Sequence, residues 1–510
     1  MLFYIHHPGF LIICTTQPGF IMRIAIVADL HYSSSELKTC NIRETGSADI
    51  ILRRAVFRLN RLIKPDLTIL AGDLVNRGGE SSGETDMQVI AEQLKLLQSR
   101  LIVIPGNHDG EVEKFYQYFP RPEPIEEIGG IRFVVNTNDE EQPRYNSWRS
   151  PQNIELITQA RQGFSGPVVT LQHTPCTPYG TNDCPYNYTN SDEINAIEAA
   201  NGVLLSISGH YHRGFKAYRS SNQVTYFAAP ALCEPPFCIT FADIDVASGA
   251  IEWHTENLQL DRNLGLIDTH IHSDLAYCSE NLSLEKIRYM ADMFGLKSFR
   301  LSEHSGHLLC AKARYRTAQY QPTDFLPEEY RGNQYFDQAL AADIPPEHIG
   351  LEADIRYDGT FLGHPDDLAR AGFRLGAIHE MGCLAERKNI SQEELRDQFL
   401  WHCQQIINNG CMTLAHPFRV FRRAGVEIPP GCFEPLIKML KASGTAAEIN
   451  FHTNEPPVEF FQLAINAGVK LTLGSDTHNL YEIGDFGLHL DFLKKCGVES
   501  NYEEVLLPLN

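Results

Sequence analysis

Short apolar runs that lead into polar residues recur along the chain from residue 22. Five of them are RIAIVADLH, LTILAGDLV, RLIVIPGNHD, GPVVTLQH and GVLLSISGHYH, and each apolar stretch runs into Asp, His or Gly. This pattern is typical of a short buried strand followed by a polar tip. Residues 48–63 and 87–99, between the runs, have helical spacing. From residue 223, QVTYFAAPAL, CITFADIDV and AIEWHTEN predict a terminal β meander.

A second series of apolar runs begins at residue 265. Its members are LGLIDTHIH, KSFRLSEH, HIGLEADI, RLGAIHE, CMTLAHP, TAAEIN and VKLTLGSDTH. Helical sequence follows most of them, over residues 283–294, 391–408, 432–442 and 457–467. Alternating strands and helices favour a barrel-like α/β domain whose functional groups lie at the carboxyl ends of the strands.

These patterns divide the chain into an N-terminal segment and two α/β domains. Residues 22–258 and 265–500 form the predicted domains, with a charged linker between them. Residues 1–21 are apolar but lack the basic start and the small-residue cleavage site of a signal peptide. Because Met22 resembles a natural start, we interpret residues 1–21 as a tail or a wrongly assigned extension.

Charge and cysteine usage narrow the partners and the compartment. The chain has 43 Lys and Arg against 64 Asp and Glu, a formal charge of −21, which disfavours long nucleic acids and anionic membranes. No run approaches the roughly 18 apolar residues that a membrane span needs. The 13 cysteines are scattered and never spaced as CxxC, which indicates reduced thiols in the cytoplasm.

Histidine and aspartate close the strands of the first domain in a fixed order. The motifs are Asp29-x-His31, Gly72-Asp73, Gly106-Asn107-His108-Asp109, His173 and Gly209-His210-x-His212. Each motif alone is weak, because a capping Asp or an exposed His is common near turns. Two divalent ions about 3.5–4 Å apart, however, need a bridging carboxylate with nitrogen and oxygen ligands around it.

This ordered set resembles the calcineurin-like metallophosphoesterase family over residues 22–258, and GDLVNRG and GHYHRG are most similar to its class III cyclic-nucleotide phosphodiesterase branch. The resemblance implies a β-sandwich flanked by helices, with manganese or iron as a dinuclear centre. One ion would be held by Asp29, His31, Asp73 and His212, and the other by Asp73, Asn107, His173 and His210. His108 would be catalytic, protonating the leaving oxygen or stabilising the transition state, with Asp109 orienting it.

The second domain carries its own ordered set at the strand ends. The motifs are His270-x-His272, Glu303-His304, Glu352, His379, His416-Pro417 and Ser475-Asp476-x-His478. Alternate residues of a strand point the same way, so the first two imidazoles can reach one ion. This order resembles the PHP (polymerase and histidinol phosphatase) domain, which implies a distorted (βα)7 barrel with two or three ions of manganese, zinc or iron.

By that resemblance, three groups of residues bind metal in the second domain. His270, His272, Glu352 and Asp476 would hold one ion, Glu352, His379 and His416 a second, and His304 and His478 a third. Cys278 stands where many members have another histidine, so either a thiolate replaces it or the third site is weak. His307, Arg356 and Arg419 could bind phosphate or simply be packed or solvated.

Two further segments and the remaining histidines have weaker signals. The loop 174–192 is either a substrate lid or a surface connection, and the insertion 315–347 has no interpretation from sequence. We expect the histidines that match neither pattern, His254, His348, His364, His402, His452 and His489, to be structural or exposed.

Together these patterns predict a bifunctional metal-dependent phosphoesterase. Metal-bound hydroxide at two separate sites would hydrolyse small phosphodiesters, such as cyclic nucleotides, and phosphomonoesters. A nuclease or nucleic-acid end-processing enzyme is the alternative, although the densest basic stretch, Arg53 to Arg61, has the helical spacing of a solvated face. A non-enzymatic scaffold is a third reading. The sequence predicts small phosphorylated substrates as partners and no membrane, and leaves the oligomeric state open.

Overall fold

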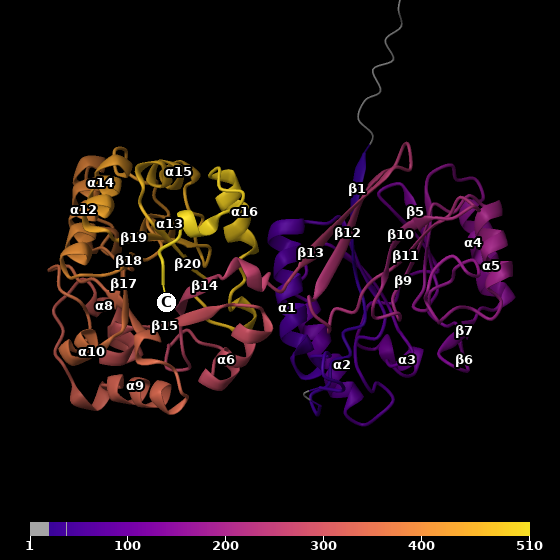
Figure 1. The fold of residues 1–510 in the computed structure, drawn as a ribbon, viewed down its shortest axis with the longest axis horizontal. Helices are drawn as coiled ribbons and strands as arrows, with labels where there is room; N and C mark the ends of the chain where they lie inside the picture. The colour runs from indigo at the N-terminus through magenta and orange to yellow at the C-terminus, as the bar shows by residue number, and fades with distance from the viewer. Residues whose placement is uncertain (1–19, 37, 510) are drawn as a thin grey trace, which may run out of the picture. The chain divides into compact units, whose positions relative to one another are not determined.

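The computed structural model describes residues 20–36 and 38–509, in two compact units that divide between Asn257 and Leu258 (Figure 1). Most of the predicted N-terminal tail falls on residues 1–19, outside the described residues. Of the two tail positions that are described, Ile21 begins strand β1 and pairs with Asp245. Within the described ranges, no helix is both long and apolar enough to cross a membrane.

Two sheets form the first unit. One has the strand order β13-β12-β1-β2-β3, and the other β10-β11-β9-β8-β5-β4. The first comprises β1 (Ile21–Val27), β2 (Leu67–Ala71), β3 (Arg100–Ile104), β12 (Cys238–Asp245) and β13 (Ile251–Asn257). The second comprises β4 (Ile125–Ile128), β5 (Ile131–Val135), β8 (Val168–Leu171), β9 (Leu205–Ser208), β10 (Phe215–Arg219) and β11 (Thr225–Ala228). A small hairpin joins β6 (Glu140–Gln142) to β7 (Asn146–Trp148).

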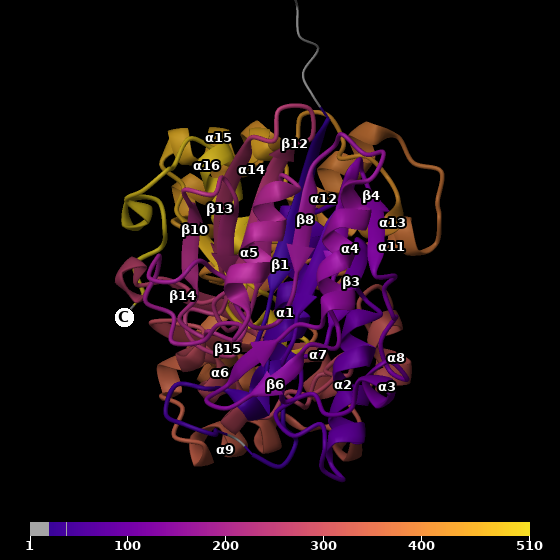
Figure 2. The same cartoon turned by 90° about the vertical axis from the view of Figure 1, so that its right-hand side faces the viewer.

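The core of this unit lies between the two sheets. Ile24 and Ile26 of β1 pack with Phe133 and Val135 of β5, whereas Val134 packs on the opposite face. That alternation follows from the two-residue repeat of a strand. Helices α4 (Pro151–Arg161) and α5 (Ser191–Ala200) cover this opposite face (Figure 2). The first predicted helix of the first domain is confirmed as α1 (Ala48–Arg58) with its π-helical extension to Ile63. The second is α2 (Gly83–Leu94), so its predicted bounds of 87–99 were too late at both ends.

The predicted terminal meander is wrong in one respect. Strands β12 and β13 do form an antiparallel hairpin, but β11 belongs to the other sheet and runs parallel to β9. The connection from β11 to β12 crosses between the sheets, and Leu232 N donates to Ala28 O on the way. The alternation of apolar residues predicts a strand but does not determine which sheet that strand joins.

A nearly closed, parallel seven-stranded sheet forms the second unit. Its order, β14 to β20, is the order of the sequence. The strands are β14 (Ile267–Ile271), β15 (Ser298–His304), β16 (Ile349–Asp354), β17 (Phe373–Ala377), β18 (Thr413–Leu414), β19 (Ala446–Asn450) and β20 (Leu471–Gly474). The two end strands meet through a bridge between Ile271 and Thr477, where Thr477 N donates to His270 O at 3.2 Å. All seven predicted strands are confirmed.

Helices connect successive strands of this barrel-like sheet and lie around it (Figure 1). The four predicted from sequence are confirmed to within one residue at each end. They are α6 (Leu284–Met293), α12 (Gln392–Asn408), α14 (Phe433–Ser443) and α15 (Val458–Ala467). The uninterpreted insertion contains most of α8 (Lys312–Ala318) and all of α9 (Gly332–Ala341), and α16 (Gly487–Lys495) follows the last strand.

Candidate metal centres

The carboxyl ends of five strands bring the predicted residues of the first unit together. Asp29 and His31 follow β1, Asp73 follows β2, residues 107–109 follow β3, His173 follows β8, and His210 and His212 follow β9. Three of these strands belong to one sheet and two to the other. The site therefore lies where corresponding ends of the two sheets meet.

Left-handed backbone turns direct several of these side chains. Asp29, His31, Asp73 and His210 have φ of 56°, 48°, 54° and 66°. Such values are uncommon outside glycine and cost energy that the surrounding structure must supply. Here backbone hydrogen bonds hold the turns, including His31 N to Asp73 O at 2.9 Å. Strain of this kind is characteristic of functional sites.

One group of ligand-type atoms surrounds His31. Its Nε2 lies 3.0 Å from Nε2 of His212 and 3.8 Å from Oδ1 of Asp29, and the latter two atoms are 3.6 Å apart. All three residues belong to the set predicted to hold the first ion.

A second group surrounds His173. Its Nε2 lies 3.2 Å from Oδ2 of Asp73, 3.2 Å from Oδ1 of Asn107 and 3.1 Å from Nδ1 of His210. The same Oδ2 of Asp73 is 3.5 Å from Nε2 of His31 in the first group. Asp73 therefore stands between the two groups, as a bridging carboxylate must.

Burial and charge set the protonation of this cluster. Burial alone would raise the pKa of Asp73, but the adjoining imidazoles, first that of His173, hold it well below its usual range. Burial, together with the neighbouring His173, lowers the pKa of His210 to about 4. The carboxylate is thus ionised and the His210 imidazole neutral, which are the forms that bind metal. Burial alone would lower the pKa of His173, but the Asp73 charge raises it to about 10, so this imidazole must lose a proton to bind metal.

The predicted role of Asp109 needs correction. Its carboxylate accepts hydrogen bonds from the backbone nitrogens of Leu74, Val75 and Gly106 at 2.8–2.9 Å, and so joins the loops after β2 and β3. His108 is instead oriented by the Asn76 carbonyl, which lies 2.9 Å from its Nδ1. The resemblance implied a pair, whereas each side chain pairs with backbone groups instead.

A pocket of about 200 Å³ opens beside the second group. Asn107, His173 and His210 line it, together with polar residues of the β6–β7 hairpin. Thr174 and Tyr188, from the segment predicted as a lid or a connection, also line it, and Thr174 Oγ1 is 2.8 Å from Ser147 Oγ. This segment therefore contributes part of the pocket wall.

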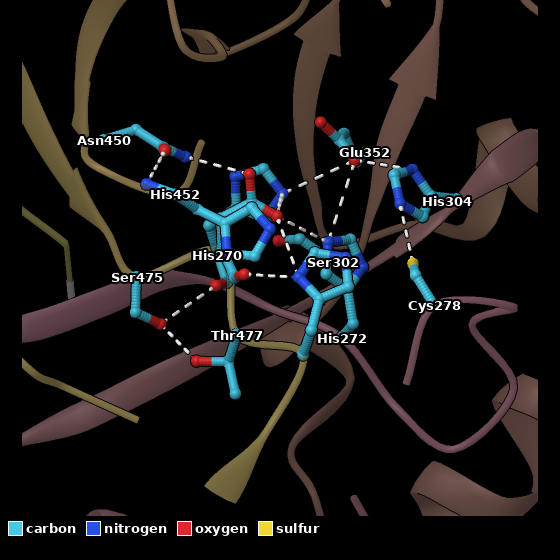
Figure 3. Close-up of polar contacts among 12 residues, drawn as sticks. His270, His272, Cys278, Ser302, His304, Glu352, Asn450, His452, Ser475 and Thr477 are labelled. Carbon is cyan, nitrogen blue, oxygen red and sulfur yellow. Dashed lines mark hydrogen bonds and ion pairs between the residues drawn. The ribbon is translucent and has the colours of Figure 1, made fainter. Parts of the chain in front are cut away.

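In the second unit, the predicted residues converge on Glu352, which lies within β16 (Figure 3). Its Oε2 lies 2.7 Å from Nδ1 of His304, 3.5 Å from Nε2 of His270 and 3.9 Å from Nε2 of His272. Its Oε1 lies 3.1 Å from Nε2 of His379 and 2.7 Å from Nε2 of His416. Each carboxylate oxygen thus faces a separate group.

Asp476 and His478 complete this cluster. Asp476 Oδ1 is 3.0 Å from Nε2 of His272 and 3.7 Å from Nε2 of His270, on the same side as Glu352 Oε2. His478, His272 and His304 form a further group whose ligand atoms lie within 4.8 Å of one another. His452, which we expected to be structural or exposed, stacks on His478 with ring centroids 4.4 Å apart.

Two buried carboxylates that the motifs missed fix the imidazoles of this unit. Glu448 Oε1 lies 2.7 Å from Nδ1 of His270, and its Oε2 accepts from His416 N at 2.7 Å. Asp354 pairs with Nδ1 of His379 at 2.5 Å. In the first unit, Glu234 plays this part with Nδ1 of His212, at 2.7 Å. Carboxylates of this kind set the tautomer and raise the basicity of a metal-binding histidine.

The residues considered for phosphate binding are mostly engaged elsewhere. The guanidinium of Arg419 is buried and paired with Asp476, and Arg356 lies over the ring of Tyr357. The basic stretch on α1 is also only partly a solvated face, because Arg54 and Arg58 are buried, at 0% and 2% exposure. That prediction was wrong for these two residues.

Comparison with known proteins shows which family the first unit matches. Residues 22–214 match the family model described as calcineurin-like phosphoesterase. Those residues form a calcineurin-like metallophosphoesterase domain. The chain is also 25% identical, over 223 residues, to a protein of Coxiella burnetii described as a probable cyclic nucleotide phosphodiesterase. That match covers 42% of this chain and 84% of the relative. The protein is accordingly a hydrolase.

Two solved structures are also similar to parts of the chain. A dimetal phosphatase from Danio rerio is 14% identical, with a TM-score of 0.37, and the match covers 46% of this chain and 98% of that one. A candidate histidinol phosphatase from Listeria monocytogenes is 14% identical, with a TM-score of 0.33, covering 43% of this chain and 97% of that one.

Orphaned polar atoms show that both clusters fit divalent cations. Buried atoms without a hydrogen-bond partner include Asp29 Oδ1 in the metallophosphoesterase domain, and His270 Nε2, Glu352 Oε2 and His379 Nε2 in the second unit. Buried polar atoms normally have partners, because an unpaired one costs about 1–3 kcal/mol. Mixed imidazole and carboxylate donors suit divalent transition-metal ions. Divalent metal ions are therefore the cofactors that these residues fit.

Proposed function

We propose that the chain is a bifunctional metal-dependent phosphoesterase with one centre in each unit. The metallophosphoesterase domain would hydrolyse small phosphodiesters of the cyclic-nucleotide type, and the second unit, as a PHP domain, phosphomonoesters. The observation that carries the proposal is the duplication of one arrangement, a buried carboxylate between two groups of imidazoles, around Asp73 and around Glu352.

Three features support a PHP assignment for the second unit. Its strands follow one another in a single parallel sheet, its candidate ligands close successive strands, and Glu352 divides its two oxygens between two ligand groups. The manganese, zinc or iron content that the resemblance implies is part of the proposal. We also propose a cytoplasmic location, because the twelve cysteines among the described residues are free thiols.

In the first domain, the predicted ligand sets would hold two ions with Asp73 shared. When bound, such ions stabilise charge on phosphoryl oxygens and activate water. The residues supply the remaining chemistry. His108 Nδ1 must donate its proton to the Asn76 carbonyl, which can only accept, so its other nitrogen is left to carry a proton to the leaving oxygen. The pocket beside His173 and His210 would hold the organic part of the substrate.

In the second unit, the carboxylates outside the ligand set do the positioning. Glu448 holds both His270 and the backbone of His416, and Asp354 holds His379. The Arg419 guanidinium counters the buried charge of Asp476 and, with the histidines, keeps the pKa of that carboxyl well below its usual range despite burial. Most of these groups are fully buried, so we expect this centre to take only small phosphomonoesters.

Two double variants test the division of labour. Asn107→Ala with His108→Ala should abolish diesterase activity, and His270→Ala with His272→Ala should abolish monoesterase activity, in full-length protein with Mn²⁺. Each variant serves as the other's folding and activity control. If either variant removed both activities equally, the two-centre proposal would fail.

A further inference from the structure

The two sheets of the metallophosphoesterase domain leave an open cleft between their edge strands. Strand β10 lies at the edge of one sheet and β13 at the edge of the other. Residues of both strands line a cleft of about 500 Å³, a size that suits a small ligand. The cleft shares no lining residue with the pocket beside His173 and includes none of the candidate metal ligands, so neither metal centre accounts for it.

Aromatic and apolar side chains make up much of the cleft wall. The indole of Trp253, on β13, packs on the ring of Phe227 with centroids 4.7 Å apart and remains partly exposed. Thr240 and Thr255, which pair across β12 and β13, add hydroxyl groups to the same wall. The cleft therefore offers an aromatic surface on which a flat ring can stack.

A bulge in β10 brings a lysine into the cleft. The pairing of β10 with β11 shifts between Phe215 and Tyr218, where Lys216 and Ala217 stand opposite Phe227 alone. In a regular strand, neighbouring side chains point to opposite faces of the sheet. The extra residue of the bulge interrupts that alternation, so Lys216 and Ala217 both line the cleft.

The rim of the cleft is cationic in a strongly acidic chain. Arg213 and Lys216 are exposed, and neither forms an ion pair with another described residue. No Asp or Glu lines the cleft. On β13, Glu252 and Glu256 alternate with Trp253 and so point to the other face of the sheet. Two unpaired cations beside an aromatic surface attract a small anion, although the whole chain has a formal charge of −21.

We propose that the cleft binds a small aromatic anion of the nucleoside monophosphate class. The ring stacks on the indole of Trp253, and the phosphate accepts hydrogen bonds from Arg213 and Lys216. No candidate metal ligand lines the cleft, so the molecule is held there without being hydrolysed. A lysine on an edge strand can also serve only to keep strands of different chains from pairing. The following experiment separates the two roles.

Tryptophan fluorescence reports on the cleft, because Trp253 is one of only three tryptophans in the chain. Trp148→Phe and Trp401→Phe together, in full-length protein with Mn²⁺, leave the indole of the cleft as the sole reporter. We would titrate this protein with the phosphonate analogue of AMP, in which carbon replaces the ester oxygen so that no phosphoesterase cleaves it. Adenosine and ribose 5-phosphate each lack one half of the ligand and are the matched comparisons.

The analogue should quench this fluorescence to saturation, and adenosine or ribose 5-phosphate should compete with it only at concentrations at least about tenfold higher. Arg213→Ala and Lys216→Ala should each weaken binding of the analogue by about tenfold and leave the affinity for adenosine unchanged. Arg219→Ala removes an exposed cation of the same strand that does not line the cleft, and should have no effect.

Three results would overturn the proposal. The first is a titration without quenching, and the second is an equal loss of affinity in Arg219→Ala and Lys216→Ala. The third is fluorescence that changes with protein concentration but not with the analogue, which would assign the cleft to a second copy of the chain.

A second measurement uses the wild-type chain. The analogue should slow acetylation of Lys216 by an amine-reactive ester and leave the rate unchanged at Lys64, an exposed lysine of the same unit, as mapped by peptide mass spectrometry. Equal rates at Lys216 with and without the analogue would contradict the proposal. Neither measurement requires turnover, so both give an answer even if the chain hydrolyses no phosphoester.

Discussion

The two units surround a central carboxylate with histidines in different ways. In the metallophosphoesterase domain, a single oxygen of Asp73 faces both ligand groups, and its other oxygen accepts from His108 N at 2.8 Å. In the second unit, the two oxygens of Glu352 each face one group. The central carboxylate of the first centre therefore also holds the loop that carries the predicted catalytic histidine. In the second centre, both oxygens of the carboxylate face candidate metal ligands.

The centres also differ in access. Asn107 of the first centre is exposed and lies at the pocket beside His173, whereas the candidate ligands of the second centre are buried or, for His379 and His478, only partly exposed. A site assembled from loops at the meeting edge of two sheets stays open, and one assembled inside a single curved sheet is enclosed. The predictions below test this difference.

The largest expected effect comes from removing each central carboxylate. Asp73→Ala and Glu352→Ala should each lower the metal content by the two divalent ions that the carboxylate would bridge. Each should also cut the activity of its own unit by at least about a hundredfold, because bound metal supplies several kcal/mol of transition-state stabilisation. Elemental analysis and kcat/KM on both substrate types measure this. If one substitution removed metal from both units, the two centres would not be independent.

A smaller effect is expected from the carboxylates that hold the imidazoles. Glu448→Gln leaves Nδ1 of His270 and the backbone nitrogen of His416 with a poorer partner in a fully buried place, and should weaken Mn²⁺ binding by about 10–100-fold. Glu234→Gln acts on His212 in a half-buried place where water can substitute, so its loss should be smaller. Calorimetric titration of each variant gives the comparison. Equal losses of Mn²⁺ affinity would show that burial of the centre does not make metal binding more dependent on the carboxylate that holds the imidazole.

The sequence was most informative where a strand and its polar tip are continuous. Six of the seven barrel strands carry a predicted ligand residue or lead into one, so the order of strands, ligands and helices could be predicted together. Glu448 was missed because it lies inside the apolar run TAAEIN rather than at its end. The role of Asp109 was misassigned because adjacency in GNHD does not reveal a turn that directs the carboxylate to the backbone of β2's loop. Neither feature has a local pattern, since both depend on which segments meet in space.

The close approach of segments also explains a glycine that sequence could not interpret. Gly474 precedes the Ser475-Asp476 motif, and a Cβ at this position would overlap Oε1 of Glu448. Gly474, the last residue of β20, is therefore restricted by a side chain on the neighbouring strand β19. The two come together because the strands pair in register at Asn450 and Gly474.

The smallest expected effect concerns stability and lies away from both centres. Burial raises the pKa of Glu198, on α5, to about 7, against about 4.3 for an unperturbed glutamate. Between these values the folded state keeps a proton that the unfolded state has released. The stability that this proton contributes is therefore complete below about pH 4.3 and is lost as pH rises through 7. The free energy of unfolding should fall by up to about 1.4 kcal/mol per pH unit over this window.

Glu198→Gln removes that titration and keeps an acceptor for the Thr170 hydroxyl, which lies 2.7 Å from Glu198 Oε1. Relative to wild type, the variant should gain thermal stability between pH 5 and pH 8, by about 5 °C in Tm for a unit of this size. Calorimetric scans of both proteins with Mn²⁺ measure the difference, and the metal contribution cancels because the centres are unchanged. Only the transition of the metallophosphoesterase domain should move, since Glu198 is buried within that domain. If the Tm of the two proteins changed with pH in the same way, the expected titration of Glu198 would be refuted. If the unfolding transitions of both units shifted by the same amount, the units would not unfold independently.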